Sequence, residues 1–563
     1  MQPSGVSLLV VETGLTAIGI LVALSWPRAG ASWLSRIESA LLLLARRRRL
    51  AVLATGCSAL AIRLAILPVL PIPQPFIHDE FSYLLAGDTF ASGRLTNPTH
   101  PLWQYFESFH ISHLPSYMSM YFPAQGMVLA AGQLLTGHAW FGVCFAAAFM
   151  CAAICWMLQG WLPPGWALLG GGLAVLRLGV FSYWANSYYG GAVPAIGGAL
   201  VLGALPRILR RFRTRDGLIM AAGAIVLGTS RPFEGVLLCV PAVAVALWSI
   251  FRRKQFRMIT APAVLLVAAA AAMGYYDYRV FGSPLTLPYQ INRTTYASAP
   301  VFVWQPARPE PSYRYAEMRD FYTNWEMKDY KEARTPSGFV NRTVQKAGIV
   351  LFFVFGVTLL TPLIMVRRVL KDRRLRYIVV AGTIFAAGLA TNVWLFPHYI
   401  APFTAGFYAV LMQAMRHLRC WRPNRQATGQ ALTRMTVMTC ILLAGLRIAA
   451  GPLNLTTPRW PSMWYGTEPF GLPRASVAAE LAKRPGKQLA VVRYAPGHAP
   501  FDDWVYNAAD IDGSQVVWAR DMGGEKNLPL LGYFKDRNVW LVEPDAVPPR
   551  VTALGVTPRL ARK

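Results

Sequence analysis

The amino-acid sequence predicts a mostly α-helical membrane protein: a polytopic transmembrane helical bundle of about 12 spans, with a small extracytoplasmic α/β domain at its C-terminal end. Three observations predict this fold class. Of the 563 residues, 54% are hydrophobic and only 15% are charged, whereas soluble proteins carry about 25% charged residues. Long apolar runs alternate with short basic clusters, and the chain becomes more polar after Pro473.

The spans are predicted from apolar runs, because a helix needs about 20 such residues to cross a bilayer. Ten runs qualify: 6–25, 50–70, 139–160, 164–181, 191–207, 258–276, 347–366, 377–396, 399–415 and 432–450. The apolar stretch Gly217–Ile250 is broken at Ser230–Gly235 and has basic clusters at both ends, so we expect it to cross twice. The run 122–138 is assigned to the membrane interface, since counting it would leave two basic clusters on opposite sides.

The formal charge of +28 indicates membrane topology and excludes a nucleic-acid partner. Five clusters hold 23 of the 55 basic residues, with Asp372 as their only acid: Arg46–Arg49, Arg207–Arg215, Arg252–Arg257, Arg367–Arg376 and Arg416–Arg425. Short basic loops between spans are typical of the cytoplasmic side, and they also attract anionic membrane lipids. Of the 27 acids, 22 lie in residues 71–121, 277–346 and 451–563, which we therefore place outside with both termini.

The chain divides into three predicted parts. Residues 1–49 form an extra N-terminal span and a cytoplasmic amphipathic helix. Residues 50–450 form the main transmembrane module, with outer loops at 71–138 and 277–346. Residues 451–563 form the extracytoplasmic α/β domain. The three acidic segments contain no cysteine, so no disulfide framework is expected.

The C-terminal domain has the pattern of a short βαβ-like unit. Helices are predicted at Pro473–Lys483 and Glu525–Phe534, and strands at Gln488–Tyr494, Gln515–Arg520 and Asn538–Glu543. The tripeptide Asp510-Ile511-Asp512 matches a motif of soluble glycosyltransferases that bind nucleotide sugars. Nucleotide sugars are cytoplasmic, whereas this domain is predicted to lie outside. We therefore interpret the tripeptide, with Asp502, Asp503 and Asp521, as a solvated acidic face or a ligand site, and not as a catalytic site.

The first outer loop brings two adjacent carboxylates to a membrane boundary. Asp79 and Glu80 follow His78 shortly after the span 50–70. Mutual repulsion and partial desolvation raise the pKa of such a pair, which favours a general base. On local sequence alone, a solvated loop start is an equal alternative. The residues that follow, up to Gly93, have the pattern of an amphipathic helix.

An Asp-Glu pair closing a span, a juxtamembrane helix that contains Tyr83, and an exit Gly93-Arg94-Leu95 resemble the polytopic GT-C glycosyltransferases. The similarity is greatest to the bacterial protein O-mannosyltransferase and lipid A aminoarabinose transferase superfamily, and it covers the C-terminal domain poorly. It implies transfer of a sugar from a polyprenyl-phosphate donor to a lipid, glycan or protein acceptor. By this resemblance the protein lies in the bacterial inner membrane, Asp79 is the base that deprotonates the acceptor hydroxyl, and Glu80 is its partner. No cofactor is expected.

A donor phosphate needs cationic and preferably bidentate side chains near the interface. Arg231 lies in the turn inside Gly217–Ile250, on the same predicted face as Asp79. An internal ion pair with Glu234 is the alternative role for this arginine. Arg279 and Arg293 in the next outer loop are further candidates, and the sequence does not decide among the three.

Aromatic side chains supply faces for sugars, although aromatic belts at membrane interfaces have the same composition. Residues 275–330 contain 14 aromatics, and residues 183–191 form a second aromatic segment. Seven of the eight histidines fall in predicted outer segments. The predicted substrate-binding residues are His78, Tyr83, Arg94, Asn186, Tyr189, Arg231, Glu234, Arg279, Tyr289, Arg293 and His398.

Three other interpretations of the sequence have less support. His110 and His113 are three residues apart and could bind a metal, but this spacing without further ligands is weak, so no metal site is predicted. A transporter or a lipid or glycan flippase could use Arg63, Arg177 and Arg231 along a pathway. Transporters gather polar residues at the membrane midplane, whereas here they gather on one face. A purely structural scaffold would leave Asp79 and Glu80 without a role.

Overall fold

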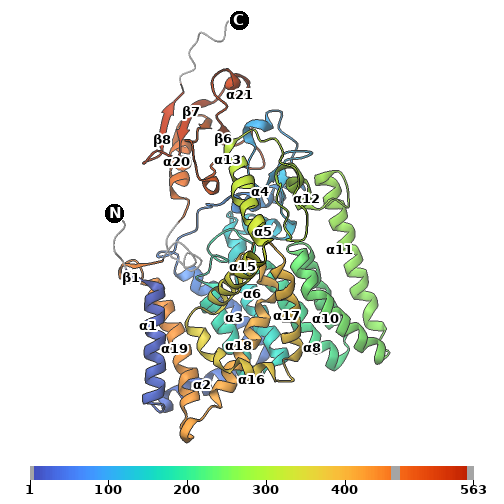
Figure 1. The fold of residues 1–563 in the computed structure, drawn as a ribbon, viewed down its shortest axis with the longest axis vertical. Coiled ribbons are helices and arrows are strands. Elements are labelled where there is room, and N and C mark those ends of the chain that lie inside the picture. Colours follow the sequence, from blue (N-terminus) through green and yellow to red (C-terminus); the bar gives the residue numbers. More distant parts are fainter. Residues whose placement is uncertain (1–5, 458–469, 555–563) are drawn as a thin grey trace.

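The structure is a computed structural model that describes residues 6–457 and 470–554. In these residues, six helices are long and apolar enough to cross a membrane: α1 (Leu8–Ser25), α6 (Trp140–Trp161), α8 (Ala192–Arg211), α10 (Pro232–Arg252), α11 (Arg257–Phe281) and α19 (Thr428–Ile448). α1 and α19 lie side by side at one edge of the bundle, and α11 stands at the other edge (Figure 1). The chain is therefore an integral membrane protein, as its composition predicts.

Five other predicted spans coincide with helices that are shorter or more charged. They are α3 (Arg48–Ala65), α7 (Pro164–Ala174) with the π-helical turn η2 (Val175–Gly179), α9 (Thr214–Gly228), α17 (Arg376–Ala390) and α18 (Thr404–Arg419). α18 is almost wholly buried and packs against α6, α8 and α19. α9 and α10 form the predicted hairpin, with its turn at residues 229–231. The total of 12 spans remains a prediction.

The predicted span at 347–366 is not one straight helix. α15 (Pro336–Phe355) ends there, and the chain bends by 108° into η4 (Thr358–Met365) and α16 (Val366–Leu370). Gly356 at the bend has φ +60°, a conformation that glycine adopts readily. Glu12 of α1 accepts hydrogen bonds from the backbone N–H groups of Val357 and Thr358 at 2.9 and 3.3 Å. A side chain from a distant helix thus caps the new turn.

The first loop forms a compact layer on one end of the bundle. α4 (His78–Ala91) packs against α5 (Pro123–Thr136), the short helix in the run assigned to the interface. Along the sequence, η1 (Trp103–Phe106) and the antiparallel pair of β2 (Ile111–Ser112) and β3 (Met118–Ser119) connect these two helices. The later loop adds α12 (Pro288–Tyr296), α13 (Ala316–Arg319), η3 (Asp320–Glu326) and α14 (Met327–Ala333). At the opposite end lie α2 (Ala31–Arg46) and α16 (Figure 1).

The C-terminal domain is a four-stranded sheet in the order β6-β5-β7-β8. Central β5 (Gln488–Val492) is fully buried and parallel to β6 (Val516–Arg520) and β7 (Asn538–Glu543), while β8 (Arg550–Ala553) is antiparallel. α20 (Leu472–Lys483) precedes the sheet, and α21 (Leu528–Tyr533) connects β6 to β7. The three predicted strands and the βαβ connection are confirmed, whereas β8, a four-residue strand directly after Pro548 and Pro549, was not predicted.

The C-terminal domain packs directly on α4, a contact that the sequence did not predict. Phe81 of α4 stacks on Tyr506 with ring centroids 4.3 Å apart. The Arg474 guanidinium lies 4.5 Å from the Phe81 ring. Asp88 at the other end of α4 accepts a hydrogen bond from the Ala509 N–H group at 2.7 Å. α4 is therefore held between the membrane bundle and the C-terminal domain.

Candidate active site

The start of α4 is fixed by Glu80. Ile77 before the helix is extended, and acidic residues occupy the first turn, where the helix dipole favours negative charge. The Glu80 carboxylate accepts hydrogen bonds from the N–H groups of Phe76 at 3.3 Å and Tyr188 at 3.0 Å. Burial raises the pKa of Glu80 to about 7, although these backbone hydrogen bonds act in the opposite direction. Glu80 thus joins the first loop, α4 and the segment 183–191.

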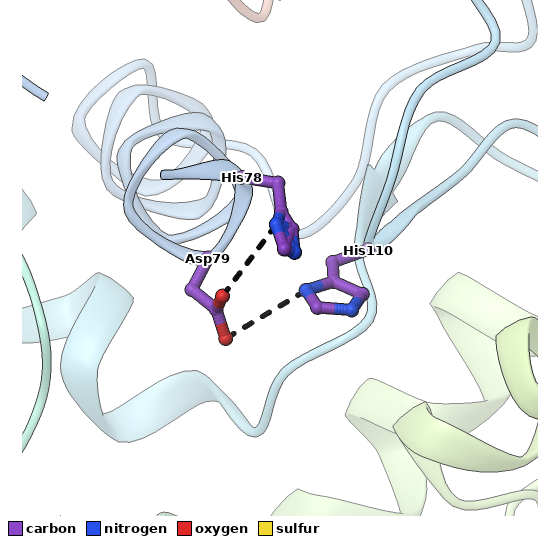
Figure 2. Close-up of side chains that lie close together, drawn as sticks. All are labelled: His78, Asp79 and His110. Carbon is purple, nitrogen blue, oxygen red and sulfur yellow. Dashed lines mark ion pairs between the residues drawn. The ribbon is translucent and has the colours of Figure 1, made fainter. Parts of the chain in front are cut away.

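Asp79 points toward the two histidines His78 and His110 (Figure 2). The Tyr121 hydroxyl donates a hydrogen bond to Oδ1 of Asp79. Nδ1 of His110 lies 3.6 Å from Oδ1, and Nδ1 of His78 lies 3.8 Å from Oδ2. Burial alone would raise the pKa of Asp79, but His110, His78 and Tyr121 together hold it well below its usual range. The raised pKa expected for the pair therefore belongs to Glu80, and Asp79 is ionised at neutral pH.

The same side chains could hold a metal ion. His78, Asp79 and His110 each offer one ligand atom, and these atoms lie within 4.8 Å of one another. Two imidazoles and one carboxylate suit zinc and similar divalent cations. The Tyr121 hydroxyl is hydrogen-bonded to Asp79 and lies 2.8 Å from Nδ1 of His110. A metal on Oδ1 and Nδ1 would therefore have to displace this hydroxyl.

Arg231 lies directly before α10, and its guanidinium is 4.4 Å from the Tyr399 ring. Its Nη1 atom is 3.7 Å from the Glu234 carboxylate, so the ion pair considered from the sequence is present, at a long distance. Tyr83 lies within electrostatic range of both Arg231 and Asp79, and so does His398. Arg231 and Asp79 thus share one group of neighbours.

Aromatic residues predicted to bind substrate gather around Asp79. Tyr83 stacks on Tyr121 with ring centroids 4.4 Å apart, and Tyr289 meets Tyr121 edge-on at 5.6 Å. Tyr189 stacks on His398 at 5.0 Å, and Asp79 lies within electrostatic range of Tyr189. The structure therefore brings Tyr83, Tyr189, Tyr289 and His398 to one site.

Four other predicted residues lie elsewhere or are already engaged. Asn186 accepts a hydrogen bond from Arg63 at 2.9 Å and donates to two backbone carbonyls of its own turn. Arg94 follows the far end of α4, about 20 Å along the helix from Asp79. Arg279 is exposed on α11 and donates to the Tyr275 hydroxyl of the same helix. Arg293 forms a buried ion pair of 2.6 Å with Glu326.

The C-terminal domain contributes one wall of the site. The Phe501 ring lies 5.7 Å from the His78 ring and 5.6 Å from Phe321. Asp503, two residues further on, is buried and pairs with Arg520 at 2.6 Å, so it does not belong to the solvated acidic face predicted from the sequence. This pair fixes the segment that carries Phe501.

The Asp-x-Asp tripeptide in the C-terminal domain makes local contacts. Oδ1 of Asp510 accepts a hydrogen bond from the Gly513 N–H group at 2.9 Å. Asp512 lies 3.1 Å from Nε2 of His100 and accepts a hydrogen bond from the Tyr533 hydroxyl at 3.0 Å. The contact between Asp512 and His100 joins the C-terminal domain to the first loop.

Sequence reasoning missed Tyr121 and Phe501, and it noted His110 only as a possible metal ligand. Tyr121 lies 42 residues after Asp79 and precedes the run read as interfacial. No local pattern marks it, since the contact depends on how β3 places the chain against α4.

No family model and no curated protein matches this sequence. The structure is similar to that of ArnT from Cupriavidus metallidurans in the apo state, with 13% identity, a TM-score of 0.48, and coverage of 86% of this chain and 92% of that chain. It is also similar to the oligosaccharyltransferase from Archaeoglobus fulgidus in complex with Zn and sulfate, with 10% identity, a TM-score of 0.48, and coverage of 88% and 67%. Both are GT-C glycosyltransferases. At these identities and TM-scores the similarity assigns no role to any residue.

Proposed function

We propose that the protein is a membrane glycosyltransferase that moves a sugar from a polyprenyl-phosphate-linked donor to an acceptor hydroxyl on the extracytoplasmic face. The carrying observation is that a carboxylate held in its ionised form, Asp79, and a cation, Arg231, each lie against aromatic residues at one end of a membrane bundle. The acceptor is a lipid, a glycan or a protein. The membrane is the bacterial inner membrane, crossed 12 times, with the C-terminal domain outside.

The reaction proceeds as an inverting displacement. The acceptor oxygen forms a bond to the anomeric carbon while Asp79 takes the hydroxyl proton on Oδ2, the oxygen that Tyr121 does not occupy. The bond between the anomeric carbon and the phosphate oxygen breaks, and its electron pair leaves with the polyprenyl phosphate. A phosphate of low basicity needs no general acid, and Arg231 offsets its charge. The low pKa of Asp79 keeps it in the basic form at neutral pH.

The remaining residues of the site bind and orient. Tyr83, Tyr189 and Tyr289 offer ring faces and hydroxyl groups to the sugars, and His398 stacks behind Tyr189. Glu80 positions Asp79 by fixing the first turn of α4. In this way Glu80 acts as the partner of Asp79.

A transport pathway has less support than a transferase. Arg63 donates hydrogen bonds to Asn186 and to the carbonyl groups of Leu70 and Pro71, and Arg177 donates to the carbonyls of Phe352 and Phe353. These arginines therefore stabilise helix ends and breaks. Such a role removes the main observation that favoured a transporter.

Substitution of the base tests the proposal. Asp79→Asn keeps the side-chain size and removes the ionisable oxygen, so we expect transfer from polyprenyl-phosphate sugars to fall about 10²- to 10⁴-fold while the protein remains folded and inserted in the membrane. Asp512→Asn is the matched control and should retain transfer, because Asn still accepts from Tyr533. Near-normal transfer by Asp79→Asn in purified, lipid-reconstituted protein would exclude Asp79 as the base. Lipid analysis of a strain lacking the protein would name the donor through the species that accumulates.

A further inference from the structure

The Asp79 carboxylate is held by a chain of hydrogen bonds that begins outside α4. The Tyr121 hydroxyl donates a hydrogen bond to Oδ1 of Asp79. The hydroxyl oxygen of Tyr121 also lies 2.8 Å from Nδ1 of His110. A hydroxyl has a single proton and accepts through its lone pairs. Since the proton is directed at Asp79, the contact with His110 requires that Nδ1 of His110 carries hydrogen and donates to Tyr121. The order of donation is therefore His110, Tyr121, Asp79.

His110 and Tyr121 are fixed to the same structural elements as Asp79. Ser82, one turn along α4, donates to the His110 carbonyl at 2.6 Å and lies 2.7 Å from the Ser119 hydroxyl. Ser119 in turn accepts from the Tyr121 N–H group at 3.1 Å. His110 has φ +58°, a conformation that is unfavourable for most side chains. The loop around His110 is thus shaped to present its Nδ1 to Tyr121.

The contacts leave the two carboxylate oxygens of Asp79 unequal. Oδ1 is occupied by Tyr121, and among the described residues no hydrogen-bond donor reaches Oδ2, whose nearest ionisable partner is His78 at 3.8 Å. The side chain of Asp79 keeps 18% of its surface exposed. In the rotamer that Tyr121 holds, Oδ2 is therefore the oxygen left without a donor, and we expect the acceptor hydroxyl to approach it.

We propose that Tyr121 is a positioning residue for the base Asp79, and that His110 sets the direction of the Tyr121 hydroxyl. This inference rests on the proposed function, since it assigns Tyr121 a task in proton removal by Asp79. Tyr121 and His110 keep their own protons, and the acceptor proton goes to Oδ2 of Asp79. Pre-organisation of this kind spares the enzyme the ordering of the carboxylate during the reaction.

A double-mutant cycle in activity tests the role. Tyr121→Phe should lower kcat about 10- to 100-fold and leave the KM values for donor and acceptor within about twofold. In the Asp79→Asn background the same substitution should have no further effect, because Tyr121 acts through the lost base. Equal losses in both backgrounds would overturn the proposal.

Substitutions of His110 test the direction of donation. His110→Asn places an amide N–H group near the position of Nδ1, and Asn tolerates a positive φ, so it should retain most of the activity. His110→Leu removes the donor and should resemble Tyr121→Phe. Equal activity of the Asn and Leu variants would overturn the role of His110. Tyr117→Phe is the matched control, since it removes a hydroxyl that donates to Asn507 at 3.0 Å, and it should leave kcat unchanged.

A cycle in thermal stability separates this inference from the proposed function. If Tyr121 and Asp79 are hydrogen-bonded, the changes in melting temperature for Tyr121→Phe and for Asp79→Ala, which removes the accepting oxygen, should not add in the double variant. This measurement needs no substrate. A non-additive stability cycle with a protein that transfers no sugar would contradict the proposed function alone, whereas additive melting shifts would contradict the hydrogen bond and with it the role of Tyr121.

Discussion

Two neighbouring carboxylates acquire different chemistry because their side chains point into different surroundings. Burial raises the pKa of Glu80 to about 7, against the lowering effect of the backbone N–H groups that it faces. Asp79 faces His110, His78 and the Tyr121 hydroxyl, and its pKa is held well below the usual range. Repulsion between adjacent acids, the interaction visible in the sequence, has less effect here than burial and hydrogen bonding. Division of labour between the base and its support follows from this difference.

The raised pKa of Glu80 predicts a dependence of stability on pH. A carboxyl group whose pKa is higher in the folded state than its ordinary value of 4.5 binds more protons when folded. Its contribution to stability is therefore fully present below about pH 4.5 and is lost as the pH rises to about 7. Glu80→Gln should flatten the fall in melting temperature between these values. The variant should also lose about 1–3 kcal/mol of stability at low pH, because an amide NH2 group cannot accept the hydrogen bond that Oε2 of Glu80 takes from the Tyr188 N–H group.

Scanning fluorimetry of wild type and variant from pH 4.5 to 8 measures this effect. Glu480→Gln is a suitable control, since Glu480 is exposed and pairs with Arg484 on the surface of α20. Parallel melting curves for wild type and Glu80→Gln across the range would show that Glu80 does not titrate there.

At the scale of elements, helix breaks are stabilised by charged residues of neighbouring helices. Glu12 of α1 caps the bend after Gly356, and Arg63 of α3 binds the carbonyl groups that follow its own helix end. Unsatisfied backbone groups are costly inside a membrane, which explains why charged side chains occur at these depths.

The contacts of Arg231 in the α9–α10 turn predict how its substitution changes the use of the donor. The pair with Glu234 spans 3.7 Å and the guanidinium also faces Tyr399, so donor groups remain for a phosphate. Arg231→Lys keeps the charge and loses the bidentate geometry. We expect it to raise the KM for the donor about tenfold or more and to change the KM for the acceptor little.

A double substitution separates this role from a purely internal ion pair. If Arg231 serves only Glu234, then Arg231→Gln combined with Glu234→Gln should recover much of the loss of either single variant, since no unpaired charge stays buried. Loss of donor use in all three folded variants is the result we expect. Recovery in the double variant, measured with steady-state kinetics, would move the phosphate site to Arg293 or Arg279.

At the scale of the whole molecule, the distribution of charge and the arrangement of the elements indicate the same orientation in the membrane. α2 and α16, which adjoin two of the basic clusters, lie at the end of the bundle opposite to α4 and the C-terminal sheet (Figure 1). The acidic segments contribute the layer around Asp79 and the sheet that packs on it. This arrangement places the site at the end of the bundle that the positive-inside pattern assigns to the outside.

Reporter fusions test this polarity. Fusions after Arg215, Arg257 or Arg376 should behave as cytoplasmic, and fusions after Gln305 or Lys563 as external, because basic loops are retained inside during insertion. An alkaline phosphatase reporter, active only outside, and a fluorescent protein that matures inside give opposite signals for each position. A cytoplasmic signal at Lys563 would remove the proposed face of the reaction.

The sequence by itself determined the class of the molecule, because membrane insertion and strand formation depend on local composition. Apolar runs, basic clusters and alternating strands mark the helices, β5, β6 and β7 without knowledge of any partner. The Asp79–Glu80 pair was also recognisable, since its position at the end of a span is a local property.

Only the tertiary structure decided what surrounds Asp79. Tyr121 and His110 reach it through a hairpin, and Phe501 packs on the adjacent His78 from a domain more than 400 residues along the chain. The bend at Gly356 likewise depends on Glu12, which is 345 residues away from Val357. Contacts of this kind arise from the packing of whole elements, whose free energy is shared among many residues, so no short stretch of sequence carries their signal.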